Sequence, residues 1–159
     1  MRIAVLSDTH GNLSWMNKLM PMFDSVDAVI HLGDLVSDAK KIQERIKCPL
    51  YYVAGNCDIM SSAPQEFEGH IGGKKIFAVH GNRHSLDYGL YSLAADARQR
   101  EAQICLYGHT HIPDITSCYG IWFVNPGSIS RPRGMSRNSY AVIEIDSRGE
   151  IIPDIIIPD

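Results

Sequence analysis

The chain has 159 residues, a formal net charge of −3 and 45% hydrophobic residues. This length suits one domain, and it lets the chain bury most of its surface in a core without stabilising disulfides. The small negative charge argues against long nucleic acid as a partner, because a domain that binds nucleic acid normally presents a basic surface.

The spacing of the cysteines and the length of the apolar segments indicate the cellular location of the protein. The four cysteines are scattered and form no C-x-x-C pair, which favours reduced thiols and a cytoplasmic location. The apolar run that opens the chain is too short for a signal peptide. No apolar run approaches the ~20 residues that a membrane-spanning helix needs. We therefore expect a cytoplasmic protein with no membrane contact.

The first third of the chain alternates between short apolar strands and amphipathic helices. Strands are predicted over residues 2–6, 27–32 and 49–55, and helices over residues 12–23 and 37–47. Ser37 or Asp38 is the expected cap of the second helix. Strands that alternate with helices in this way indicate parallel pairing. The segment WMNKLMPMF is rich in methionine, and it is either ordinary core or a contact in a homo-oligomer.

The remainder of the chain is dominated by strand–turn–strand patterns. Residues 66–81 read as a hairpin that turns at Gly72-Gly73, a sequence suited to tight turns. A helix over 86–101, a strand over 102–108 and two further hairpins over 115–127 and 139–157 follow. Parallel units that lead into hairpins predict two mixed sheets packed face to face and flanked by helices, a four-layer α/β/β/α sandwich.

Five apolar strands end in side chains that commonly bind metals. The residues at these ends are Asp8, His10, Asp34, Asn56, Asp58, His80, His109 and His111. Taken singly, each has an ordinary explanation as a helix cap, a turn residue or a core histidine. Together they indicate one site, because ligands bind at the carboxyl ends of strands in α/β sheets. Gly33, Gly55 and Gly108 would allow the backbone to approach such a site closely.

The candidate ligand set is larger than one ion needs. It comprises Asp8, His10, Asp34, Asn56, His80, His109 and His111. The mixture of nitrogen and oxygen donors suits two first-row divalent ions that share a carboxylate. We expect Mn²⁺ first, with Fe, Zn, Ni or Co as alternatives. Such a pair would remain positively charged, attract a phosphate ester and supply hydroxide for displacement at phosphorus.

The motifs SDTHG, GD, GNCD, HG and GHTH, in this order, resemble those of the calcineurin-like metallophosphoesterases. The short length and the GNCD motif resemble the small bacterial and archaeal phosphodiesterases of that superfamily, which also show the NPGS found at residues 125–128. The resemblance covers residues 1–159 as a single metallophosphoesterase domain. It implies the same two-sheet sandwich and hydrolysis of small phosphodiesters by a bridging hydroxide of a di-metal centre.

The resemblance also implies a role for each motif residue. Asp8, His10 and His111 would hold one metal, and His80, His109 and Asn56 the other. Asp34 would bridge the two ions. Asp34, Asn56 and His109 would form the catalytic group, with Asn56 also near the substrate phosphate. Asp58 would lie behind the ligands and orient one of them.

Cys57 departs from the wider superfamily, in which many members have a histidine after Gly-Asn that is thought to assist the leaving group. A thiol is a poorer general acid than imidazolium at neutral pH, so phosphomonoesters are expected to be poor substrates. A cysteine beside a cationic centre should have some thiolate character, yet we expect Cys57 to shape substrate choice rather than to act as nucleophile.

His84 could supply an imidazole to assist the leaving group in place of Cys57, or be a solvated loop residue. Arg131 and Arg133 could contact the phosphate, or form a basic loop.

Two other functions compete with the phosphodiesterase interpretation. One is a catalytically weak scaffold or binding protein of the same fold, like the retromer scaffold subunit. Such a scaffold could lose ligands such as Asn56 or His80, whereas this chain retains the full set. The other is a nuclease of the same superfamily, which would usually carry an added domain or a basic surface. The sequence therefore favours an enzyme that acts on a small phosphodiester.

Overall fold

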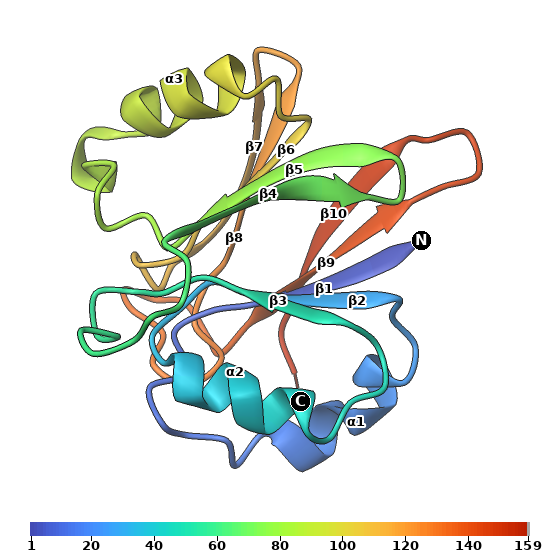
Figure 1. Ribbon diagram of the computed structural model, residues 1–159, viewed down its shortest axis with the longest axis vertical. Coiled ribbons are helices and arrows are strands. Elements are labelled where there is room, and N and C mark those ends of the chain that lie inside the picture. The colour runs from blue at the N-terminus through green and yellow to red at the C-terminus, as the bar shows by residue number, and fades with distance from the viewer. Residues whose placement is uncertain (159) are drawn as a thin grey trace.

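The computed structural model describes residues 1–158, which form two five-stranded sheets with helices on their outer sides (Figure 1). The strands are β1 (Arg2–Leu6), β2 (Ala28–His31), β3 (Leu50–Tyr52), β4 (Glu66–Ile71), β5 (Lys74–Val79), β6 (Ile104–Leu106), β7 (Pro113–Cys118), β8 (Ile121–Pro126), β9 (Tyr140–Ile145) and β10 (Ile151–Ile156). The helices are α1 (Met16–Phe23), α2 (Val36–Gln43), the short 3-10 helix η1 (Leu86–Tyr88) and α3 (Tyr91–Gln99).

The strand order confirms the predicted four-layer sandwich of mixed sheets. The first sheet runs β10-β9-β1-β2-β3 and the second β4-β5-β6-β8-β7. Strands β1, β2 and β3 are parallel, as are β5, β6 and β8, whereas hairpins supply the antiparallel partners. Helices α1 and α2 cover the first sheet, and α3 covers the second (Figure 1). The carboxyl ends of the central parallel strands therefore meet at one edge.

The core explains why the central strands are apolar on both faces. Ile3 and Val5 of β1 point between the two sheets, while Ala4 and Leu6 point toward the helices. This alternation follows from the two-residue repeat of a strand. The methionine-rich segment lies in the outer core, where Trp15, Met16, Leu19 and Phe23 are buried. Self-association through this segment stays a prediction.

Two predicted helices differ in detail from the structure. The helix expected over 86–101 is divided into η1 and α3, because Gly89 between them has a φ of 98° that no helix accommodates. The helix expected from residue 12 begins only at Met16. Before it, the Asn12 side chain accepts hydrogen bonds from the backbone N–H and the hydroxyl of Ser14, which fixes a turn.

The prediction that Ser37 or Asp38 caps the second helix is wrong. Helix α2 begins at Val36, one residue before Ser37, and neither Ser37 nor Asp38 is the capping residue. Instead, the Val36 N–H donates to Asp58 Oδ1 at 2.7 Å. An acceptor from a distant loop thus serves the role that a local side chain normally plays. None of the helices within residues 1–158 is long and apolar enough to cross a bilayer.

Candidate metal centre

The loops that follow β1, β2, β3, β5 and β6 bring all seven predicted ligands into one cluster. Contacts between their side chains join Asp8, His10, Asp34, Asn56, His80, His109 and His111. Five of them have a left-handed backbone, with φ between 47° and 68°: Asp8, His10, Asp34, His109 and His111. Non-glycine residues rarely adopt this conformation, and it concentrates at functional sites.

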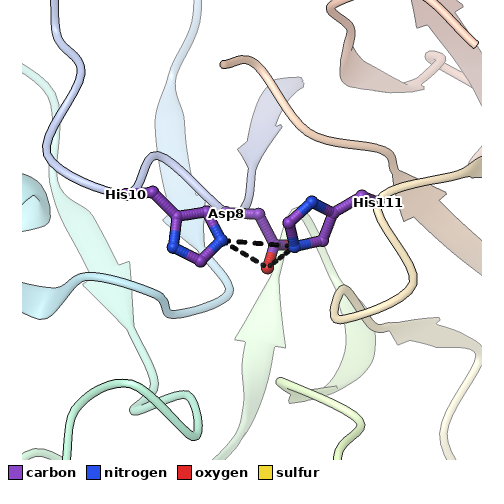
Figure 2. Close-up of side chains that lie close together, drawn as sticks. All are labelled: Asp8, His10 and His111. Atoms are coloured by element: carbon purple, nitrogen blue, oxygen red, sulfur yellow. Dashed lines mark hydrogen bonds and ion pairs between the residues drawn. The ribbon is translucent and has the colours of Figure 1, made fainter. Parts of the chain in front are cut away.

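One half of the cluster consists of Asp8, His10 and His111 (Figure 2). Asp8 Oδ1 lies 3.1 Å from His111 Nε2 and 3.8 Å from His10 Nε2. The two Nε2 atoms are 3.2 Å apart. One carboxylate oxygen and two ring nitrogens, any of which could bind a metal ion, thus lie close together. They come from two loops that are about a hundred residues apart in the chain.

A cation would fit between these atoms. His111 Nδ1 donates to the Arg131 carbonyl at 2.5 Å, so in the neutral imidazole Nε2 presents a lone pair toward Asp8. Asp8 Oδ1 is buried and has no hydrogen-bond donor. A proton or a metal ion would relieve the repulsion between these lone pairs. Burial opposes a proton on His111, but the Asp8 carboxylate raises the pKa of His111 above its ordinary value.

The other half of the cluster repeats this arrangement around Asn56. His80 Nδ1 donates to the Leu32 carbonyl at 2.7 Å, which leaves Nε2 as an acceptor. That Nε2 lies 3.0 Å from Asn56 Oδ1 and 3.6 Å from Asp34 Oδ2. His109 Nδ1 lies 3.0 Å from the same Asn56 oxygen. A backbone carbonyl that fixes the tautomer of a histidine is the usual support of a metal ligand.

Asp34 lies between the two halves. Its Oδ1 accepts the Cys57 N–H at 2.8 Å, whereas Oδ2 faces His10 Nε2 at 3.9 Å and His80 Nε2 at 3.6 Å. A Cβ atom at Gly55 would lie 2.0 Å from Asp34 Oδ1, so only glycine fits there. One oxygen of Asp34 is thus held by the backbone, and the other is free to bridge two ions.

Two glycines at the other strand ends permit close approach, as the sequence indicated. A Cβ atom at Gly33 would lie 2.5 Å from the Gly55 nitrogen. A Cβ atom at Gly108 would lie 2.1 Å from Ser7 Oγ. Any side chain at either position would separate the loops that carry the ligands.

Burial favours the neutral form of two histidines of the cluster, because it lowers their pKa values. Burial lowers the pKa of His10, against the raising effect of Asp34 and Asp8. Burial also lowers the pKa of His109, as does the charge of His80. A neutral imidazole is the form that binds a metal ion.

Arg131 and Arg133 are exposed near the cluster. The charge of Arg131 further lowers the pKa of His10, and the charge of Arg133 further lowers the pKa of His109. Their guanidinium groups are thus near enough to act on the site.

Asp58 lies behind the ligands. Its Oδ2 accepts the Asp34 N–H at 3.1 Å and the Gly55 N–H at 2.8 Å, while Oδ1 accepts the Val36 N–H. One carboxylate therefore ties the loop after β3 to the loop after β2 and to the start of α2. This arrangement supports the backbone of Asp34 rather than contacting the point where ions would bind.

Cys57 is exposed beside the cluster. Its Sγ, a ring nitrogen of His10 and a carboxylate oxygen of Asp34 all lie within 4.8 Å of one another. Burial and a hydrogen bond to Asp34 raise the pKa of the Cys57 thiol to about 11. The surrounding protein groups therefore favour the thiol form of Cys57, and the thiolate character expected beside bound cations stays a prediction.

His84 is paired with a residue of α3. Its Nε2 lies 3.1 Å from Asp96 Oδ2 of α3, and its side chain is only 11% exposed. The structure therefore pairs His84 with a helix residue, and it is not a solvated loop residue. Its assistance to the leaving group stays a prediction.

The sequence did not single out the polar residues that hold the loop of Asp8. Ser7 Oγ donates to Asp8 Oδ2 at 2.6 Å, and Ser128 Oγ donates to the Asp8 carbonyl at 2.8 Å. Asn125 Nδ2 donates to the Gly108 carbonyl at 3.0 Å. Asn125 and Ser128 belong to the NPGS motif, which was the only signal for them.

Buried His31 joins the first two ligand loops. Its Nδ1 accepts the Gly33 N–H at 3.2 Å, and its Nε2 lies 3.2 Å from Thr9 Oγ1. Burial lowers the pKa of His31 to about 4, so it is neutral at pH 7. It lies behind the cluster and links the backbone of the loop after β2 to Thr9.

Known proteins resemble the whole chain. The sequence model of the calcineurin-like phosphoesterase superfamily domain matches residues 1–148. The chain is 29% identical over 148 residues to the probable metallophosphoesterase YsnB of Bacillus subtilis (strain 168), covering 92% of this chain and 86% of YsnB. It is 26% identical over 171 residues to the phosphodiesterase YfcE of Escherichia coli (strain K12), covering 92% and 89%.

Solved structures give the same result. A predicted phosphoesterase from Streptococcus pneumoniae TIGR4 superposes with a TM-score of 0.84 and 35% identity, covering 99% of this chain and 89% of the other. Vps29 of Entamoeba histolytica, solved in complex with zinc, superposes with a TM-score of 0.77 and 22% identity, covering 98% of each chain. The likeness to Vps29 is one of fold alone.

Proposed function

The chain belongs to the calcineurin-like phosphoesterase superfamily, and on that premise we propose that it is a phosphodiesterase that uses two divalent metal ions. Membership in the superfamily supports a metal-dependent phosphoesterase. The preference for diesters and the use of two ions go beyond membership, and they rest on the geometry of the cluster.

The proposal of two metal ions rests on the side-chain nitrogen and oxygen atoms that face one another in the cluster. His111 and His80 each donate one ring N–H to a backbone carbonyl, so their other nitrogens face Asp8, Asp34 and Asn56 as acceptors. Two groups of ring nitrogens and side-chain oxygens gathered at such short distances suit two ions. Asp34 Oδ2 faces both groups. Asp8, His10 and His111 would hold one ion, His80, His109 and Asn56 the other, and Asp34 both.

Two bound divalent ions would polarise the phosphoryl oxygens and supply hydroxide from water near neutral pH. The residues of the chain would position the reaction. Asp34 would fix the spacing of the two halves, and Asn56 and His109 would lie nearest the substrate phosphate. Arg131 and Arg133 would attract its negative charge from the rim of the site. Mn²⁺ remains the first expectation for the metal, with Fe, Zn, Ni or Co as alternatives.

The preference for diesters follows from Cys57 and is supported by the name of the relative from Escherichia coli, a phosphodiesterase. Cys57 stands beside the cluster as a thiol of raised pKa. Such a group gives little help to a leaving alkoxide. Small diesters with good leaving groups would therefore react best, and phosphomonoesters slowly.

The proposed activity predicts metal-dependent hydrolysis of bis-p-nitrophenyl phosphate. Protein treated with EDTA should be inactive, and added Mn²⁺ should restore turnover. Calorimetry should show that about two Mn²⁺ ions bind per chain over the same range of Mn²⁺ concentration. An alkyl phosphomonoester, which has a poor leaving group, should react more slowly. Stoichiometric binding of metal without any turnover would instead favour a scaffold of the same fold.

Exchanging Cys57 for histidine should raise hydrolysis of an alkyl phosphomonoester, whose alkoxide leaving group needs a proton, relative to bis-p-nitrophenyl phosphate by about tenfold or more. An imidazolium can protonate a leaving group at neutral pH, and general acids typically contribute ~10²–10⁴-fold. Cys57→Ser should keep diester turnover within about tenfold of the wild type, because an activated aryl leaving group needs little protonation. Both variants are compared by kcat/KM at equal metal occupancy. Loss of all turnover in Cys57→Ser with both metals bound would rule out the proposed mechanism.

A further inference from the structure

A hollow of about 530 Å³ lies beside the metal cluster. Its lining consists of Val36, Ser37, Lys40, Cys57, Asp58, Ile59, Met60 and Ser61. The residues come from the start of α2 and from the connection between β3 and β4, two segments that lie near each other in Figure 1. The hollow is thus built from the same loops that supply Asp34 and Asn56.

Two large apolar side chains of this hollow are almost fully exposed. Ile59 is 86% exposed and Met60 is 98% exposed. Apolar side chains packed in the core contribute to stability, whereas these two bury little surface against the rest of the chain. Exposed apolar groups gathered at the mouth of a site are typical of ligand contact.

Cys57 connects the hollow to the point where the phosphoryl group would bind. It lines the hollow, and its thiol lies within 4.8 Å of donor atoms of His10 and Asp34. A phosphodiester has two ester arms on one phosphorus. With the phosphoryl group held at the ligands, one arm can therefore extend past Cys57 into the hollow.

The charges of the lining do not repel an anionic ester. The Asp58 carboxylate is engaged by three backbone N–H groups. Lys40 is exposed and forms no ion pair within residues 1–158. The remaining polar groups are the Ser37 and Ser61 hydroxyls and the Cys57 thiol. The hollow thus offers apolar contact with a few polar groups, the usual composition of a small-molecule site.

We propose that the hollow binds an apolar or aromatic ester arm of the substrate, and that Ile59 and Met60 are the residues that select it. The inference rests on the proposed function, because the cluster must hold the phosphoryl group. It narrows the substrate class to phosphodiesters in which at least one alcohol is aromatic or otherwise apolar. Diesters of small polar alcohols would leave Ile59 and Met60 without contact.

Binding of phosphonates tests this inference separately from catalysis, since their C–P bond resists hydrolysis. Calorimetry on the Mn²⁺-loaded protein would compare phenylphosphonate with methylphosphonate. The wild type should bind the phenyl compound about tenfold more tightly, as expected for an apolar group in a partly open pocket. The double variant Ile59→Ser/Met60→Ser should reduce this ratio to about twofold and leave methylphosphonate binding unchanged.

The matched control is Tyr88→Ser, which removes a side chain that is 84% exposed on η1 and lies outside the hollow. It should bind both phosphonates as the wild type does. An equal affinity for the two phosphonates in the wild type, or an unchanged ratio in the double variant, would overturn the inference. Failure of the proposed function would look different, because neither phosphonate would bind and bis-p-nitrophenyl phosphate would not be hydrolysed.

Discussion

Replacing Asp34 with asparagine should lower kcat/KM for bis-p-nitrophenyl phosphate by roughly 10³-fold, or about 4 kcal/mol of transition-state stabilisation. The amide oxygen would keep the hydrogen bond from the Cys57 N–H, because that donor lies 2.8 Å from Oδ1. The amide NH₂ would then take the place of Oδ2, opposite His10 and His80. A donor at that position would repel both cations, and one negative charge would be lost.

Kinetics and metal analysis on the same protein samples would measure this effect. Asp34→Asn should bind fewer than two ions per chain after dialysis against Mn²⁺. The control Asp154→Asn changes an exposed aspartate of β10 and should behave as the wild type does. An Asp34→Asn protein that held two ions and kept wild-type turnover would refute the bridging role.

Replacing Asp58 with alanine should lower the free energy of unfolding by about 3 kcal/mol even without metal. The carboxylate accepts three backbone N–H groups, and a hydrogen bond to a charged group contributes ~1.5–3 kcal/mol. The full sum is not expected, since Asp58 is half-buried and water can reach some of the donors. Metal affinity should also fall by about 10–100-fold, because the Asp34 backbone loses its support.

Urea unfolding in EDTA separates this effect from metal binding, and calorimetry with Mn²⁺ then measures affinity. Asp58→Asn should be less damaging than Asp58→Ala, because one amide oxygen retains part of the hydrogen bonding. The control Asp154→Ala should unfold at the wild-type urea concentration. The supporting role would be excluded if Asp58→Ala unfolded at that same concentration and bound Mn²⁺ normally.

The sequence by itself determined the architecture and the set of candidate ligands. Apolar runs that alternate with amphipathic helices require a parallel sheet, and the carboxyl ends of its strands must share an edge. Asp8, Asp34 and His80 could therefore be assigned to one place although they are far apart in the chain. Helix boundaries were less certain, because the start of α2 depends on Asp58 and the break before α3 depends on the backbone angle of Gly89.

Only the tertiary structure decided which atoms of these residues face one another. The tautomers of His80 and His111 depend on the carbonyls of Leu32 and Arg131, which no local pattern identifies. The sequence left open whether His84 is a solvated loop residue, and only the position of α3 shows that it pairs with Asp96. Such contacts depend on how the two sheets pack and on the paths of their loops. The sequence pattern therefore indicates which residues meet at the edge, and the packing fixes the direction of each lone pair.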